Sequence, residues 1–525
     1  MTGNTAVSPW QRERQTWTDY YERQLHRQLA QAVVLLNSAP RPQQLKRHFD
    51  SFLVLLRRAR ARPDLRVAGI ELLAALHPWP QRWGYWDAWE QELERAIPLL
   101  AAFGRTEQQA GMMTAVAQIQ FDTGRLETAA AAARAALELA WEGRLAAAWG
   151  AAVNRYILTL NRLGQNREAR RLLTQFEAQL DALPFAATEK ERLEAAGHLL
   201  LRRIIFLRHD GRAAEAARRV GRLIKQLARQ PQADQFLLAF LYEEHATMLW
   251  ASDQYEPAVA SLQKAIDLYG RIGDEFAEAS ARGNLGIVYW SMARLNEAEE
   301  AIWQSLRAAE AFNARWRVAN EMGNLCAISL HQGRLQRALR FTERHLQLAQ
   351  AVDDAAEIDR AQGNRVQILL YLERYAEVLP ALRESIAQLE ALEMQWQVAQ
   401  GYANLSCCLY GLGRLAEGET AVNRAAALAQ EIDSPLLAGL VLRCRALFAS
   451  PEEAAALTEQ ALALARQHKH RLSAARCLLR LAVLASGERR QALWAEGEAI
   501  MREIGAEAWV NGRSPENPPT VAMIL

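Results

Sequence analysis

The chain has 525 residues, of which 50% are hydrophobic and 23% are charged. This composition is typical of a soluble folded protein and excludes wholesale disorder. The 62 basic and 60 acidic residues leave a net charge of +2, so no overall field favours nucleic acid, a membrane or an acidic substrate.

Residues 1–40 are polar at the start, rich in Arg and Gln, and carry no apolar core of signal-peptide length. The longest apolar stretches, such as 436–442, are far shorter than the roughly 20 residues that span a bilayer. The five cysteines lack C-x-x-C spacing, which argues against a disulfide framework or a zinc site. We therefore expect a helical extension over 1–40 in a cytoplasmic protein with no metal, no cofactor and no membrane contact.

Residues 41–100 are predicted to form a helical cap or divergent repeats. Segment 41–66 is basic: it has two acids, Asp50 and Asp64, against eight basic residues, Arg41, Lys46, Arg47, Arg57, Arg58, Arg60, Arg62 and Arg66. A clustered charge of this kind would attract phosphates, so a nucleic-acid-associated regulator is one alternative. The apolar residues at helical spacing favour an ordinary amphipathic helix with a solvated charged face, and nucleic acid is not the expected partner.

Four tryptophans follow in the same region. Trp79, Trp83, Trp86 and Trp89 lie within eleven residues, and three of them partly share one helical face. We expect a buried aromatic cluster at the end of the array rather than a ligand site.

Residues 101–510 contain few prolines and many Ala, Leu, Arg and Glu residues, which favours a run of helices. Thr188 with Glu191, Asp354 with Glu357, and Ser450 with Glu453 have the spacing of a helix N-cap and its acidic partner. No sustained alternation predicts a strand. The expected fold class is all-α.

An internal repeat of 40 residues decides the architecture. Asparagines recur at that spacing as Asn284, Asn324, Asn364 and Asn404. Nine residues after each comes a predicted turn, and a small or short residue follows five residues later. Each unit is therefore predicted to be a helix, a tight turn with a left-handed residue, and a second helix packed closely on the first.

This pattern resembles the tetratricopeptide repeat (TPR) family over about residues 101–500, as nine or ten units. The long repeat is similar to those of kinesin light chain and of MalT-like and peptide-sensing bacterial regulators. Two departures are Arg365, which replaces an apolar residue, and the units around residues 155 and 202, which lack the asparagine. The resemblance implies a right-handed superhelical solenoid of antiparallel helix pairs, in which the first helix of each pair lines the concave surface.

The resemblance also implies that the four asparagines form a ladder along the groove and bind the backbone of an extended peptide. The small preceding residues Gly283, Gly323, Gly363 and Ala403 would leave space for the second chain. Alternatively, the asparagines fix the geometry of the repeats. The flanking positions are expected to tune specificity and include Arg360 as their only formal charge. They are Ser280, Asn320, Arg360 and Gln400 on one side and Ile287, Ala327, Gln367 and Cys407 on the other.

No motif for nucleotide binding, metal-dependent hydrolysis or nucleophilic catalysis occurs, so we expect no enzyme and no catalytic residue. The predicted function is a protein- or peptide-binding scaffold. One alternative is a regulatory or sensor subunit of a bacterial signalling, defence or transcription-control system, whose groove is occupied by its own C-terminal tail. Residues 511–525 contain Gly, Ser, Pro and Asn and are predicted to be a flexible tail. The sequence leaves the partner's identity and the oligomeric state open.

Overall fold

The computed structural model describes residues 9–37, 42–77, 79–80, 83–231, 233–312, 314–351, 355–391, 394–432 and 434–519. Within these residues every regular element is a helix, and no strand occurs. The chain divides into two compact units: unit 1 comprises Met1–Ala281 and Ala308–Ala314, and unit 2 comprises Arg282–Arg307 and Arg315–Leu525.

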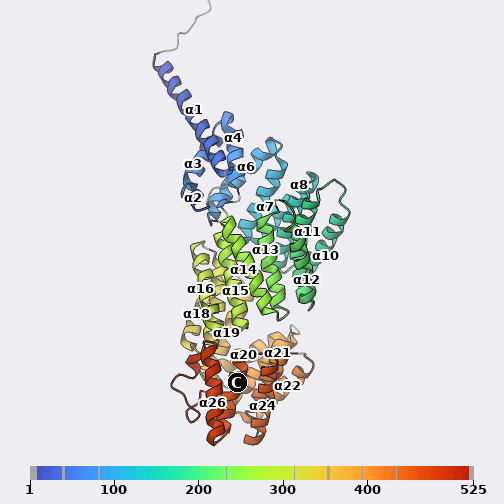
Figure 1. Cartoon of the computed structure of the whole chain (residues 1–525), viewed down its shortest axis with the longest axis vertical. Helices are drawn as coiled ribbons and strands as arrows, with labels where there is room; N and C mark the ends of the chain where they lie inside the picture. Colours follow the sequence, from blue (N-terminus) through green and yellow to red (C-terminus); the bar gives the residue numbers. More distant parts are fainter. Residues whose placement is uncertain are drawn as a thin grey trace, which may run out of the picture. The chain divides into compact units, whose positions relative to one another are not determined.

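Unit 1 begins with an N-terminal group of helices (Figure 1): α1 (Pro9–Asn37), α2 (Pro42–Arg47), α3 (Phe49–Arg60), a short 3-10 helix (Pro63–Leu65), α4 (Arg66–Leu76) and α6 (Trp86–Ala102). The second half of α1 packs on α3 and α4 through Leu25, Leu29 and Leu36, which are buried. Its first half is exposed, with Trp10 and Trp17 about two-thirds accessible.

The rest of unit 1 consists of helix pairs: α7 (Thr106–Asp122) with α8 (Leu126–Glu142), α9 (Ala146–Arg162) with α10 (Asn166–Asp181), α11 (Glu189–His209) with α12 (Ala213–Leu227), and α13 (Gln235–Trp250) with α14 (Tyr255–Ile272). First helices of successive pairs also pack on one another, α9 on α11 and α11 on α13. Equivalent positions on these helices are therefore brought side by side.

Unit 2 continues the same arrangement. Its pairs are α15 (Glu275–Ser291) with α16 (Leu295–Ala311), α17 (Arg315–His331) with α18 (Leu335–Ala351), α19 (Ala355–Tyr371) with α20 (Tyr375–Ala391), α21 (Gln395–Gly411) with α22 (Leu415–Gln430), α23 (Pro435–Arg445) with α24 (Pro451–Gln467), and α25 (Arg471–Leu484) with α26 (Gly487–Glu503). The start of α15, up to Ala281, and the end of α16, from Ala308, belong to unit 1. A 3-10 turn, η2 (Glu507–Trp509), follows. The prediction of an all-helical, TPR-like solenoid of paired helices is confirmed.

Left-handed residues close the turns between paired helices, as the repeat predicted. Gly164, Gly333 and Gly413 have φ values of +78°, +83° and +72°. Residues other than glycine adopt the same conformation in several turns, among them Ala293 and Glu373, with φ of +58° and +57°. A left-handed backbone is costly for a residue with a Cβ atom, so packing of the helices on both sides imposes the turn there.

Two of the three predicted N-caps are confirmed, and the third, Asp354, lies outside the described residues. The Thr188 side chain accepts a hydrogen bond from the backbone N–H of Glu191, and the Glu191 carboxylate accepts one from the N–H of Thr188. Ser450 accepts from the N–H of Glu453 at 3.3 Å. These side chains satisfy amide groups that have no partner within the helix.

Unit 2 is closed on itself by its C-terminal residues. The backbone N–H of Leu295, at the start of α16, donates to the carbonyl of Ile504 at 3.1 Å. Trp509 is buried and lies against Gly333 in the turn between α17 and α18. The last helix pair therefore packs on turns that belong to earlier pairs of the same unit.

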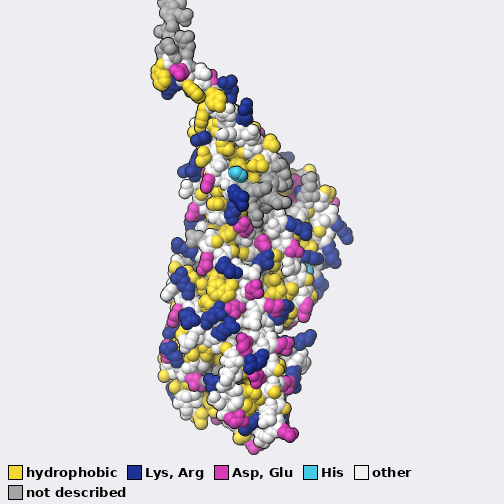
Figure 2. Space-filling model, turned by 60° about the vertical axis from the view of Figure 1, so that its left-hand side comes forward, with side chains coloured by type: hydrophobic (Ala, Val, Ile, Leu, Met, Phe, Trp, Pro, Cys, Tyr) yellow, Lys and Arg dark blue, Asp and Glu magenta, His cyan; other side chains and the backbone are white. Residues whose placement is uncertain are grey.

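Acidic and basic side chains are interspersed over the visible face of the molecule (Figure 2), in keeping with the net charge of +2. In the described part of the chain, no helix is long and apolar enough to cross a membrane.

Candidate functional site

The four predicted asparagines lie at one position of four successive first helices, α15, α17, α19 and α21. Each is half-buried. Asn284, Asn324 and Asn404 are followed by the buried residues Leu285, Leu325 and Leu405, whereas Asn364 is followed by the exposed Arg365. Because α17 packs on α19 and α19 on α21, this common position forms a row along unit 2. We call this row the asparagine row.

The members of the asparagine row differ in their hydrogen bonds. Asn324 is already engaged: its amide donates to Glu321 at 3.0 Å, and its carbonyl accepts from Arg360 at 3.2 Å. Asn284 also interacts with a neighbouring group. Asn364 and Asn404 make no hydrogen bond to any described residue, so their amides remain available to a ligand.

A buried polar network runs through the first part of the row. The Glu321 carboxylate, 1% exposed, accepts from the hydroxyl of Ser305 at 2.7 Å and forms an ion pair with Arg317 at 3.1 Å. Further along, the Arg360 guanidinium donates to Glu357 at 3.0 Å and to the backbone carbonyl of Asn320. These residues tie α16, α17 and α19 together.

Glu357 has a second partner in this network, the imidazole of His345, which is fully buried. The two side chains lie 2.7 Å apart. Burial raises the pKa of Glu357, but hydrogen bonds from His345 and the charge of Arg360 outweigh this and leave it below its ordinary value. The carboxylate therefore stays ionised.

This network adds two acids to the charge that the flanking positions place beside the row, Arg360. Glu321 and Glu357 lie next to it, and Glu357 neutralises its charge. Glu321 occupies a position at which the neighbouring repeats have Ala281, Ala361 and Gly401. In the sequence, Glu321 stands out as a lone acid among these small residues, and this signal could have revealed its role in the network.

The glycines before the asparagines are also not equivalent. A Cβ atom on Gly283 would lie 2.7 Å from Oε1 of Glu321, and one on Gly323 would overlap Arg360 and lie 2.8 Å from His345. The expected space for a second chain is therefore filled by the protein's own side chains at these two positions. A Cβ atom on Gly363 would meet nothing within 4 Å, so the open space lies beside Asn364.

The remaining predicted flanking residues lie on the same helices as the row. Asn320, Gln367 and Gln400 are half-buried. The side-chain oxygen of Asn320 accepts from Asn324 at 3.3 Å. Gln367 and Gln400 make no hydrogen bond within the described chain and lie on the two helices that carry Asn364 and Asn404.

The basic segment 41–66 is largely neutralised by acids of unit 1. Arg57 and Arg60 bind the buried Glu92 at 3.0 and 2.6 Å. Lys46 binds Glu275 at 2.7 Å, and Arg62 binds Glu22. Arg41 lies outside the described residues. The segment therefore offers far fewer available cations than its sequence suggested.

The tryptophan group is a buried cluster, as expected. Trp83, Trp86 and Trp89 are at most 5% exposed, and the ring of Trp79 stacks on that of Trp83 with centroids 5.6 Å apart. Trp86 packs edge-on against Phe276.

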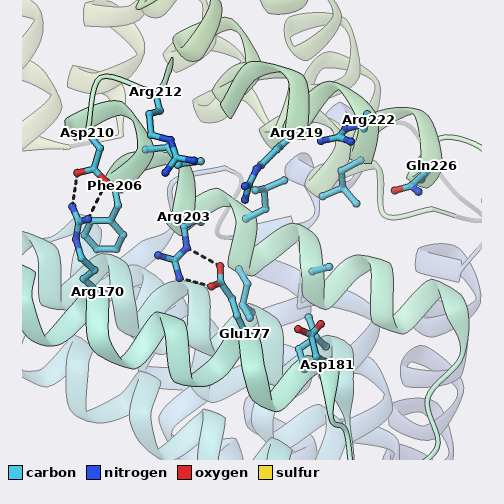
Figure 3. A pocket seen from close by; sticks show the side chains of 16 residues that line it. Arg170, Glu177, Asp181, Arg203, Phe206, Asp210, Arg212, Arg219, Arg222 and Gln226 are labelled. Carbon is cyan, nitrogen blue, oxygen red and sulfur yellow. Dashed lines mark hydrogen bonds and ion pairs between the residues drawn. The ribbon is translucent and has the colours of Figure 1, made fainter. Parts of the chain in front are cut away.

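A cavity of about 820 Å³ lies in unit 1 between α10, α11 and α12 (Figure 3). Ion pairs hold two of its arginines in place: Arg170 with Asp210 at 3.0 Å, and Arg203 with Glu177. Arg212 and Arg219 enter from α12 and share Glu215 outside the cavity. Four of its arginines are thus paired with acids of the chain.

Among the described residues, no group of three or more His, Cys, Asp or Glu side chains could hold a metal ion. Cys408 is buried, and Cys407 lies 3.6 Å from Cys444 of α23, measured between sulfur atoms. The described part of the tail contacts α26, where Arg490 pairs with Glu516 and Arg502 donates to Asn511.

Comparison with known proteins supports the repeat assignment. The tetratricopeptide repeat family model matches residues 237–311. No curated protein matches the chain. Among solved structures, the apo form of the quorum sensor NprR from B. thuringiensis is similar in fold, with 12% identity and a TM-score of 0.50 over 66% of this chain and 97% of that one.

Two further solved structures are similar to the chain, with lower TM-scores. A Rap protein complexed with competence and sporulation factor has 16% identity and a TM-score of 0.47, over 67% of this chain and 99% of the other. Aspartyl phosphate phosphatase F from Bacillus subtilis has 14% identity and a TM-score of 0.43, over 68% and 94%. Residues 237–311 thus match a tetratricopeptide repeat, and the stack of paired helices is similar in fold to NprR.

Proposed function

We propose that unit 2 binds an extended peptide segment along the asparagine row and that the protein acts by binding rather than by catalysis. The observation that carries this proposal is the state of Asn364 and Asn404. Both amides stand at the same position of packed helices, half-exposed, with no partner in the described chain and with open space beside Gly363. An amide can donate to and accept from a peptide backbone at once, which suits a ligand of variable sequence.

The proposal narrows the site predicted from the sequence. Asn364 and Asn404 would hold the backbone, and Gln367 and Gln400 would select side chains. Asn284, Asn324, Asn320 and Arg360 would support the site from within the chain, since Asn324 and Arg360 bond to each other.

We also propose a regulatory or sensor role, because the fold is similar to that of NprR, which is described as a quorum sensor. A nucleic-acid role for segment 41–66 is the weaker alternative, since most of its described cations are paired with acids. The partner is therefore expected to be a protein or peptide in the cytoplasm.

Photo-crosslinking tests the peptide site. A photoreactive phenylalanine analogue at Gln367 is expected to capture a polypeptide from the native host's lysate, and a synthetic peptide covering the captured segment then serves as ligand. Asn364→Ala with Asn404→Ala should weaken its binding roughly 10- to 100-fold, the loss of two to three hydrogen bonds. Asn423→Ala, an exposed asparagine on α22 of the same unit, should leave binding unchanged.

Equal helicity by circular dichroism excludes misfolding of the variants. If the double variant binds the peptide as tightly as the wild type, or if the analogue captures the same polypeptide from position 423, the asparagine row is not the binding site.

A further inference from the structure

A single apolar stripe runs along α1. Trp10, Trp17 and Tyr21 recur at intervals of seven and four residues, which keeps them on one side of the helix. The same spacing continues to four buried residues: Leu25, Leu29, Ala32 and Leu36. Because α3 and α4 pack on α1, the second half of the stripe belongs to the core of unit 1.

The first half of the stripe is exposed. Figure 1 shows this part of α1 extending beyond α3 and α4. Trp10 and Trp17 are 69% and 66% exposed, and Tyr20 and Tyr21 are 51% and 47% exposed. The guanidinium of Arg58 lies 5.7 Å from the ring centroid of Tyr21 and covers that ring in part. Single exposed aromatic residues are common, but four within one short segment of a helix form a patch, and such patches mark interaction surfaces.

This part of α1 also needs a partner to remain helical. Residues 9–21 make about three and a half turns, and an isolated helix of this length is marginal in water. Short helices in proteins are held mainly by the packing of their apolar face. In the first half of α1 that face is in solvent, so a second surface over the rings would supply the missing packing.

The charges of this part of α1 favour a second copy of the chain over an anionic surface. Segment 9–23 has three arginines and three acids, so its net charge is zero. A helix that binds nucleic acid or an anionic membrane has an excess of Lys and Arg. Two neutral copies would not repel each other, and the exposed Arg14, between the two tryptophans on the stripe, would stack on a ring of the other copy.

The exposed rings are large enough for a dimer interface. At their exposed fractions, the four aromatic side chains present about 500 Å² per chain. Two such faces would bury about 1,000 Å² in total, and polar neighbours on the helix would add to this area. Specific interfaces begin at about 1,000–1,200 Å², so we expect a dimer with a Kd in the micromolar range.

We propose that the chain forms a dimer in which the exposed halves of two α1 helices pack on each other through Trp10, Trp17 and Tyr21. The two copies would be related by a twofold axis, so that the same face is buried on both. The interface would complete the apolar stripe that α3 and α4 cover further along the helix. The surface belongs to unit 1 alone, so it stands or falls independently of the asparagine row in unit 2.

Sedimentation velocity of the full chain between about 1 and 100 µM tests the proposal. The mass should rise from that of one chain, 59.0 kDa, towards twice that value as the concentration increases. Trp17→Glu places a charge at the centre of the patch on both copies at once, and should raise the Kd of the dimer at least about 30-fold. Trp10→Glu is a second variant that should act in the same direction.

Phe103→Glu is the matched control. Phe103 is an aromatic residue of the same unit, 45% exposed, at the C-terminal end of α6, and its substitution should leave the Kd unchanged. Trp10 and Trp17 are exposed in the single chain. Their substitution should therefore change the Tm by no more than about 1 °C at a concentration at which the wild type is monomeric, and this result excludes misfolding.

Four outcomes would overturn the proposal. The first three are a single-chain mass up to about 100 µM, a dimer whose Kd neither tryptophan variant changes, and a Kd that Phe103→Glu raises as much as Trp17→Glu does. The fourth is binding of a monomeric wild-type chain to vesicles of phosphatidylcholine and phosphatidylserine that Trp17→Glu abolishes. That result would assign the aromatic patch to a membrane surface instead.

Discussion

The indole N–H of Trp509 donates a hydrogen bond of 2.8 Å to the backbone carbonyl of His331, 178 residues earlier in the chain. His331 is the last residue of α17, so its carbonyl is among those that have no partner within the helix. The bond therefore satisfies a helix end and fixes the C-terminal residues of unit 2 at the same time.

The turn that receives Trp509 should be unusually sensitive to substitution. Gly333 has a φ of +83°, and a Cβ atom there would lie 2.9 Å from the Trp509 ring. Gly333→Ala is expected to lower the free energy of unfolding by about 3 kcal/mol, from backbone strain and displaced packing together. Gly413→Ala is the matched control: its φ is +72°, but nothing lies within 4 Å, so a loss of about 1 kcal/mol is expected. Urea unfolding of both variants measures the difference, and equal losses would show that Trp509 adds nothing.

His331 should make the stability of unit 2 depend on pH. Burial and the charge of Arg476 lower the pKa of His331 to about 3, and its Nδ1 accepts a hydrogen bond from Trp290 at 2.9 Å. The unfolded chain takes up a proton near pH 6.5 and the folded one does not, so stability is complete above that pH and falls as the pH falls towards 3. Between pH 6.5 and 5 the loss is about 2 kcal/mol.

His331→Gln should flatten this dependence, because glutamine does not titrate. The measurement is urea unfolding at pH 7, 6 and 5, followed by tryptophan fluorescence. Parallel pH profiles for the wild type and the variant would contradict the assignment.

Substituting alanine for the glycines beside the asparagine row should lower the stability of the protein at two positions and raise it at the third. Gly283→Ala and Gly323→Ala would push into Glu321, Arg360 and His345, and each should destabilise the protein by about 1–3 kcal/mol. Gly363→Ala meets nothing and should stabilise it by about 1 kcal/mol through helix propensity. Thermal unfolding of the three variants gives the comparison. A loss of stability in Gly363→Ala would mean that the space beside Asn364 is not open.

The left-handed turn residues other than glycine offer a stabilising change. Glu373 has a φ of +57° and is exposed. Glu373→Gly should raise the free energy of unfolding by about 0.5–1 kcal/mol, because glycine adopts this conformation without strain. Glu384→Gly, within α20, is the control and should lower it by about 1 kcal/mol. A decrease in both variants would indicate that the Glu373 side chain stabilises the turn in some other way.

Much of this structure follows from the repeat of 40 residues. The period fixed the place of Asn284, Asn324, Asn364 and Asn404 on equivalent helices, and it located the turns even where Ala293 or Glu373 replaces glycine. Residues that recur at the same place in the 40-residue repeat occupy equivalent positions on stacked helices, so the row itself was predictable.

The contacts that distinguish one repeat from the next were not predictable in this way. Glu321 breaks the pattern of small residues at its position. Besides Arg317, one turn earlier on its own helix, it binds Ser305 of the preceding helix. The bond between Trp509 and His331 joins segments with no common period. Such contacts depend on the detailed fit of side chains, which a repeating pattern does not encode.

The contact of η2 and α26 with the turns of earlier pairs changes how unit 2 can unfold. In a linear array, terminal repeats fray first, because each repeat has a neighbour on only one side at the end. Here the last pair has neighbours on both sides, through Leu295, Gly333 and Trp509. Loss of the C-terminal residues should therefore loosen the beginning of unit 2 as well as its end, and unit 2 should melt as one cooperative ring rather than repeat by repeat.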